Sequence, residues 1–274
     1  RLSIGVQSFQ DDVLETLNRN HDGHQALRAV ELALDAGFEV VSFDLMFGIP
    51  GQEMASWERD LAMLERFDGL RHISGYNLTI EPGTAFQRRQ ERGRLTMPPE
   101  KLSLEMLSRL VDACERRGIE RYEVSNFASD GARSRHNTLY WTGAEYLGLG
   151  MGAHSLRITG EGHVLRRANH EQRAAYTDQP TMPDGIEQLT PNQHLVERLF
   201  LGVRTREGLD WCEVEHQFSD GVSGDILGDA HELLGQMAEE EFLDEKSGVF
   251  RPTHRGLNLA DALARRIAAR IGDS

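Results

Sequence analysis

Histidine, aromatic and glycine residues are concentrated between Arg135 and Ser155. If residues 135–141 form a helix, His136 and Tyr140 are four positions apart and share a face, with Trp141 beside them. An imidazole next to flat rings suits a planar, iron-bearing ligand. The structural alternatives are a histidine that caps a turn and aromatic residues that anchor a core.

Glycines recur just after this segment, at positions 148, 150 and 152. They permit positive φ angles and close approach of the backbone, so the loop can line a ligand. The spacing is not a dinucleotide fingerprint. His154 follows the loop, and we expect it to be structural.

Polar residues also occur at the ends of predicted strands. Gln7 ends the first strand, Asp44 lies inside an apolar second strand, and Thr79 lies near the end of the third. Ligands of α/β proteins bind at the carboxyl ends of parallel strands. Asp44 in particular needs a ligand or a buried partner, because an unpaired buried carboxylate is costly. The structural alternatives to ligand binding are that the Gln7 amide only hydrogen-bonds a neighbouring loop and that Arg19 is a solvated surface side chain.

Short apolar runs alternate with amphipathic stretches over the first 127 residues. Strands are predicted at residues 2–7, 40–46, 73–80 and 122–127, and helices at 24–36, 56–66 and 99–117. Gly37 and Gly118 stand where two of these helices should end. This alternation predicts an α/β fold with a parallel sheet and right-handed crossovers.

The second part of the chain has a different pattern. Prolines mark a predicted linker at residues 177–191, which separates a domain over residues 1–176 from an α-rich domain over 192–274. The α-rich domain should contain helices at 193–201, 211–217, 226–240 and 257–271 with a hairpin at 242–251. Residues 190–274 contain 9 Lys and Arg against 16 Asp and Glu, so we expect no nucleic-acid partner.

Composition narrows the class of protein. The formal charge is −14, 39% of residues are hydrophobic, and no apolar run approaches the length of a membrane span. Cys114 and Cys212 have no spacing typical of a disulfide framework or a zinc site. We therefore expect a cytoplasmic protein with two reduced thiols that is not an integral membrane protein.

Four motifs together resemble a known family. They are GVQSF at residues 5–9, DLMFGIPGQ at 44–52, HNxxYW at 136–141 and GxGAHS at 150–155. This set and its order are similar to the HemW-type heme chaperones, radical-SAM proteins related to the oxygen-independent coproporphyrinogen III oxidases. The resemblance implies the rear half of a partial (β/α)6 radical-SAM barrel, followed by a winged-helix-like domain.

The resemblance also implies cofactors. The positions that match the S-adenosylmethionine site are Gln7, Arg19, Asp44, Met46 and Thr79. The positions that match the heme site are His136, Tyr140 and Trp141, with His136 as the ligand of the heme iron. The family holds a [4Fe-4S] cluster on a CxxxCxC loop, which these residues do not contain. We therefore expect them not to cleave S-adenosylmethionine by themselves, and we expect an open sheet edge at residues 2–7.

Three functions follow as hypotheses. The first is a heme chaperone that delivers heme to client apoproteins, with respiratory enzymes among them, and the resemblance also allows a homodimer. The second is an oxygen-independent coproporphyrinogen III oxidase-like enzyme of porphyrin biosynthesis. The third is an inactive, truncated remnant, which would give no cooperative melt. The HNxxYW motif favours the chaperone.

Overall fold

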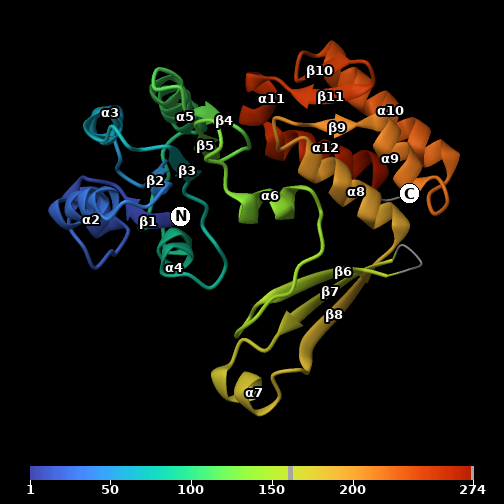
Figure 1. The fold of residues 1–274 in the computed structure, drawn as a ribbon, viewed down its shortest axis with the longest axis horizontal. Helices are drawn as coiled ribbons and strands as arrows, with labels where there is room; N and C mark the ends of the chain where they lie inside the picture. Colours follow the sequence, from blue (N-terminus) through green and yellow to red (C-terminus); the bar gives the residue numbers. More distant parts are fainter. Residues whose placement is uncertain (160–162, 273–274) are drawn as a thin grey trace. The chain divides into compact units, whose positions relative to one another are not determined.

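The computed structural model describes residues 1–159 and 163–272 (Figure 1). The chain divides into two compact units, Arg1–Arg133 and Ser134–Ser274. Each unit has its own apolar core. No described helix has both the length and the apolar character needed to cross a membrane.

The first unit is built on a five-stranded sheet in the order β1-β2-β3-β5-β4. Its strands are β1 (Leu2–Gln7), β2 (Val41–Phe47), β3 (His72–Asn77), β4 (Glu120–Arg121) and β5 (Asn126–Ala128). Its helices are α1 (Asp11–Thr16), α2 (Gly23–Asp35), α3 (Met54–Ala62), the 3-10 helix η1 (Met63–Arg66), α4 (Ala85–Glu91) and α5 (Glu100–Glu115). Strands β1, β2 and β3 are parallel, as predicted.

The strand predicted at residues 122–127 is confirmed only at Asn126 and Phe127, and the expected parallel direction is wrong. This stretch forms a turn and β5, and β5 runs antiparallel to both β3 and β4. The cause is the Glu123 carboxylate, which accepts hydrogen bonds from the Ser125 N–H and the Asn126 side-chain amide and so closes the turn. The helix ends were predicted correctly, since Gly37 and Gly118 follow α2 and α5 with φ of 76° and 66°.

The two faces of the sheet differ in chemistry. On β2, Phe43 and Leu45 point into an apolar core with α2, α3 and α5, while Asp44 lies between them on the opposite face. At the core, the Trp57 indole N–H donates to the Met106 carbonyl at 2.8 Å. We call the face without this core the polar face. Its members on the three parallel strands are Ser3, Ser42, Asp44, Met46, His72, Ser74 and Tyr76.

The second unit begins with α6 (Arg135–Trp141) and an antiparallel sheet of β6 (His154–Ile158), β7 (Val164–Asn169) and β8 (Pro183–Leu189). In Figure 1 these three strands form a long ribbon next to the short helix α7 (Arg173–Asp178). Strand β8 lies inside the stretch predicted as a linker, and it pairs with β7 from Val164↔Leu189 onward. The boundary between the two compact units lies between Arg133 and Ser134, while the predicted domain division at residues 177–191 stays a prediction.

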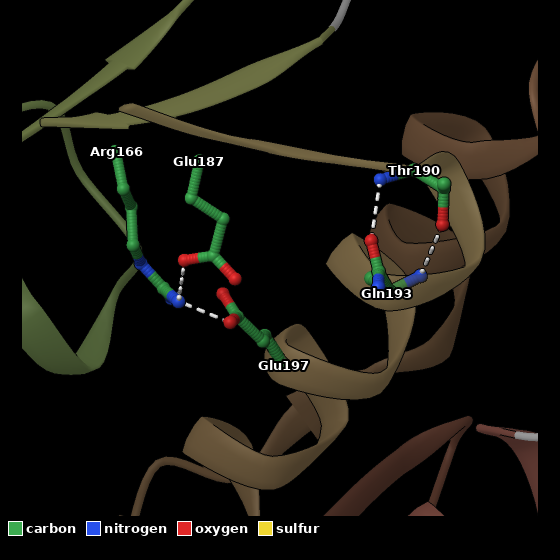
Figure 2. A network of polar contacts seen from close by, with 5 residues as sticks. All are labelled: Arg166, Glu187, Thr190, Gln193 and Glu197. Atoms are coloured by element: carbon green, nitrogen blue, oxygen red, sulfur yellow. Dashed lines mark hydrogen bonds and ion pairs between the residues drawn. The ribbon is translucent and has the colours of Figure 1, made fainter. Parts of the chain in front are cut away.

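The remaining elements follow the predicted helix and hairpin order. They are α8 (Pro191–Gly202), β9 (Leu209–Asp210), α9 (Trp211–Phe218), α10 (Gly224–Glu239), β10 (Leu243–Lys246), β11 (Val249–Pro252), α11 (His254–Asn258) and α12 (Ala260–Ile271). Helix α8 starts with a capping box, in which Thr190 and Gln193 exchange side-chain and backbone hydrogen bonds (Figure 2). The wing hairpin β10–β11 gains β9 as a third strand.

The contact between β3 and α5 gives a test of this packing. A Cβ added at Gly75 would lie 2.1 Å from a methyl group of Leu110, so Gly75→Ala should lower the free energy of unfolding by about 1–3 kcal/mol. The control is Gly228→Ala in α10, where no atom lies within 4 Å. The control should raise stability, by at most about 1 kcal/mol. Urea unfolding followed by circular dichroism measures both; equal effects would contradict the packing.

Candidate functional site

Asp44 lies on the polar face, opposite Ser74 of β3 in the parallel register. Burial raises the pKa of Asp44, and hydrogen bonds from the Ser74 and Ser3 hydroxyls together with the charge of Arg1 offset part of that shift. The carboxylate is half-buried. Asp44 therefore has the polar partners that its place in an apolar strand requires.

His72 pairs with Ser42, two positions before Asp44, on the same face and is fully buried. Its Nε2 lies 3.0 Å from the Tyr122 hydroxyl. Burial, with a smaller effect of Arg1, lowers the pKa of His72 to about 3, so its ring is neutral near pH 7. Its Nδ1 is buried and has no hydrogen-bond partner among the described residues. Sequence reasoning did not select His72, because its partner is 50 positions away.

Gln7 has a backbone conformation that non-glycine residues seldom adopt. Its φ is 67°, and the Ser8 N–H donates to the Val6 carbonyl at 2.9 Å across it, which makes a tight three-residue turn. Strained residues of this kind cluster at functional sites. Gln7 pairs with Leu45 of β2 after an irregularity in the register, so it lies beside the strand that carries Asp44.

The turn at Gln7 is anchored by Asp60 of α3, which is 0% exposed. Its carboxylate accepts hydrogen bonds from the Ser8 hydroxyl at 2.6 Å, the Phe9 N–H at 2.7 Å and the Gln10 amide at 3.2 Å. Asp60 fixes the three residues that follow Gln7. It was missed at the sequence level, where it reads as one of many acidic residues on an amphipathic helix.

The other three predicted S-adenosylmethionine residues are less enclosed. Met46 packs at the edge of a small apolar cluster formed by Val13, Leu17 and Ile49. Arg19 is exposed after α1, and Thr79 is exposed just beyond β3. The structure thus brings Gln7, Asp44 and Met46 onto neighbouring strands and leaves Arg19 and Thr79 in loops.

The two cysteines cannot hold an iron–sulfur cluster. Cys114 is buried in the apolar core, where burial raises the pKa of its thiol, and Cys212 is exposed on α9. Within residues 1–159 and 163–272, no group of three His, Cys, Asp or Glu side chains could hold a metal ion. The cluster implied by the family resemblance therefore has no ligands among these residues.

His136 and Tyr140 are neighbours on α6, as their spacing predicted. His136 Nε2 lies 3.2 Å from the Tyr140 hydroxyl, and the ring centroids are 5.0 Å apart at an interplanar angle of 87°. Tyr140 in turn meets Tyr146 edge to face, with centroids 4.7 Å apart. His136 is exposed, Tyr140 is 40% exposed and Trp141 is half-buried. An imidazole at the surface thus starts a row of three rings.

Exposed apolar side chains lie on α6 and on the loop after it. Leu139 follows His136 on the helix, while Leu147 and Leu149 are 75% and 79% exposed and Met151 is 52% exposed. Large apolar side chains that gather in one exposed patch mark binding surfaces, and these four lie within 13 positions of the chain. The segment has the composition of a surface for a flat, apolar ligand.

The glycine loop is held by residues that sequence reasoning missed. The Asn169 side chain donates to the carbonyls of Gly148 and Gly150 at 3.2 and 2.9 Å, and the Gly150 N–H donates to the Tyr176 hydroxyl at 3.0 Å. Gly150 has φ of 104°, and a Cβ at Gly148 would lie 2.1 Å from the His154 carbonyl oxygen. The glycines are therefore required by the backbone path itself.

The buried Asp60 gives a pH-dependent test. Burial raises its folded-state pKa, so its contribution to stability is full below the unfolded value of about 3.9 and is lost as the pH rises through the folded value. Asp60→Asn lacks this titration. The stability of the original protein minus that of the variant should therefore fall as the pH rises from about 4 to 7. A pH-independent difference in urea unfolding would refute the raised pKa.

The clamp on the glycine loop gives a second test. Asn169→Ala removes two hydrogen bonds, which together contribute about 1–2 kcal/mol, and should speed hydrogen exchange at the amides of Gly150 and Gly152 by about tenfold. The control is Gln188→Ala on the exposed side of β8, which should leave these rates unchanged. Unchanged exchange in Asn169→Ala would mean that the loop is held by other contacts.

Comparison with known proteins finds two family models, one within each compact unit. The family model of the radical SAM superfamily matches residues 1–64, and that of the HemN C-terminal domain matches residues 189–259. The solved structure of the coproporphyrinogen III oxidase HemN from Escherichia coli superposes with a TM-score of 0.75 over 97% of this chain and 63% of that chain. At 19% identity this likeness shows the fold, and the sheets of the present chain are not closed.

Sequence relatives are more similar. The heme chaperone HemW of Bacillus subtilis (strain 168) is 33% identical over 262 residues, which cover 93% of this chain and 66% of that protein. HemW of Lactococcus lactis subsp. lactis (strain IL1403) is 34% identical over 80% of this chain and 56% of that protein. The mitochondrial radical S-adenosyl methionine domain-containing protein 1 of Mus musculus is 34% identical over 96% of this chain and 61% of that protein. The chain thus spans just over half to about two thirds of the length of these relatives, and it belongs to the HemW-type family of the radical SAM superfamily.

Proposed function

We propose that this chain is the heme-binding part of a heme chaperone, which delivers heme to client apoproteins. The observation that carries the proposal is the exposed His136–Tyr140 pair on α6, at the start of a row of rings and beside exposed apolar side chains. The names of the HemW relatives support the same function.

The chemistry of the pair fits heme as cargo. A neutral imidazole ligates heme iron, and apolar side chains contact the porphyrin plane. In this structure the Tyr140 hydroxyl lies within hydrogen-bond distance of Nε2 and so fixes the orientation of the ring. Iron bound at Nε2 would replace that hydrogen bond. Trp141 is the third residue proposed for heme contact.

For S-adenosylmethionine, we propose the carboxyl end of β1–β3, with Gln7, Asp44 and Met46 on the strands and Arg19 and Thr79 in the loops. Carboxylate and amide groups can hydrogen-bond its ribose and amino groups, and Arg19 can pair with its carboxylate. S-adenosylmethionine becomes a radical source only beside a reducing cluster. Because the present residues cannot hold that cluster, we propose no radical step for them.

The oxidase hypothesis has weaker support, since the likeness to HemN concerns the fold alone. Respiratory clients and a homodimer remain predictions from the family resemblance. A cytoplasmic location is also a prediction, supported by the two free cysteines, Cys114 and Cys212.

Heme titration tests the proposal. Adding heme to the protein should give a saturable shift of the Soret band, and His136→Ala should abolish the shift or weaken binding at least about tenfold, because it removes the iron ligand. Tyr140→Phe keeps the ring next to Nε2 and should retain the shift. The control is His216→Ala, which changes another exposed histidine, on α9.

Two outcomes would contradict the proposal. One is the absence of a saturable shift in the original protein, which would exclude heme binding by this chain. The other is an unchanged spectrum in His136→Ala, which would exclude His136 as the iron ligand. Circular dichroism of each variant checks that the fold is retained.

A further inference from the structure

A pocket of about 190 Å³ lies inside the second unit, at the end of the row of rings that starts at His136. Tyr140 and Tyr146 line one part of it, and His194, Glu197 and Arg198 of α8 line another, together with Arg166 of β7. The pocket is smaller than the roughly 300–1,000 Å³ of typical ligand sites, so it can hold a substituent and not a whole porphyrin.

The two arginines of the pocket differ in their partners. Arg166 forms ion pairs with Glu197 of α8 and with Glu187 of β8, the latter at 3.4 Å (Figure 2). Arg198 also lines the pocket, but no carboxylate lies within ion-pair distance of it in the part of the chain that the structure describes. Arg198 therefore has no direct carboxylate partner among the described residues, although Glu187 and Glu197 together balance the charges of Arg166 and Arg198.

The surroundings of Arg198 favour an anion. Burial lowers the pKa of Arg198, an effect that the more distant charge of Glu213 partly offsets, and burial also lowers the pKa of His194. His194 is thus a neutral neighbour, packed edge to face on Phe218 with centroids 4.9 Å apart. A carboxylate placed beside Arg198 would form a charge-assisted hydrogen bond and so offset part of the cost of burying the guanidinium.

We propose that this pocket binds a carboxylate substituent of the porphyrin carried on α6, with Arg198 as the pairing cation. The inference rests on the proposed heme function and adds the part of the ligand that is recognised. Two ring contacts, of 5.0 and 4.7 Å, lead from the His136 imidazole through Tyr140 to Tyr146 at the pocket. Arg198 lines the same pocket as Tyr140 and Tyr146, at the far end of this row from His136.

The test compares heme with its dimethyl ester, in which both carboxylates are blocked. The original protein should bind heme about tenfold more tightly than the ester, the ratio expected for one charge-assisted pair. Arg198→Gln should reduce heme affinity to that of the ester and leave ester affinity unchanged. Arg198→Lys should restore part of the preference. The matched control is Arg173→Gln on α7, an exposed arginine in the same unit, which should change neither affinity.

The outcomes separate the two proposals. If neither heme nor ester binds the original protein, the heme-carrier proposal fails. Equal binding of heme and ester overturns only the carboxylate pocket, as does an Arg198→Gln variant that weakens both ligands equally. A third arm uses acetate alone: if acetate raises the melting temperature of the original protein and not of Arg198→Gln, while heme and ester bind equally, the pocket is a free-anion site and the porphyrin assignment is overturned.

Discussion

The first unit depends on a sheet whose two faces must satisfy opposite requirements. One face excludes water with the aromatic and aliphatic side chains of β2, α2, α3 and α5, and the other carries hydroxyl, carboxylate and imidazole groups on adjacent strands. Buried polar groups are tolerated only when they are hydrogen-bonded, so the polar face is held by pairs such as Ser42 with Ser3 and His72 with Tyr122. These pairs account for buried hydroxyl and imidazole groups on a face that has no apolar core.

The region around α6 follows the opposite logic. There, aromatic and aliphatic side chains are exposed. A polar side chain holds the backbone in place instead, since Asn169 donates hydrogen bonds to two carbonyls of the glycine loop. The backbone of the glycine loop is thereby fixed, which lowers the entropic cost of ordering this loop when a ligand binds. The two units thus present different chemical environments, one with polar side chains on a sheet face and one with exposed apolar side chains.

Local patterns predicted much of this structure, and long-range pairing explains most of what they missed. The period of the apolar residues identified α2, α5 and the parallel strands. The spacing of His136 and Tyr140 was enough to predict that they are neighbours, because both lie on one helix. The turn at Glu123 was missed because its neighbours are residues that favour strands. The sequence pattern does not show that the Glu123 carboxylate accepts a hydrogen bond from the Ser125 N–H and so closes a turn. Strand β8 was taken for a linker because of its prolines, yet Pro183 stands at its first position, where a sheet tolerates proline. Asp60 acts on residues some 50 positions away, so no local signal could single it out.

The exposure of the α6 surface also has a kinetic consequence. A ligand on an open surface keeps one side accessible, so a recipient can begin to bind it before the carrier has let go. For the heme site that we propose, such associative transfer would make the rate of exchange rise with recipient concentration instead of being limited by spontaneous dissociation. Leu147 and Leu149, which are 75% and 79% exposed, contribute to this openness.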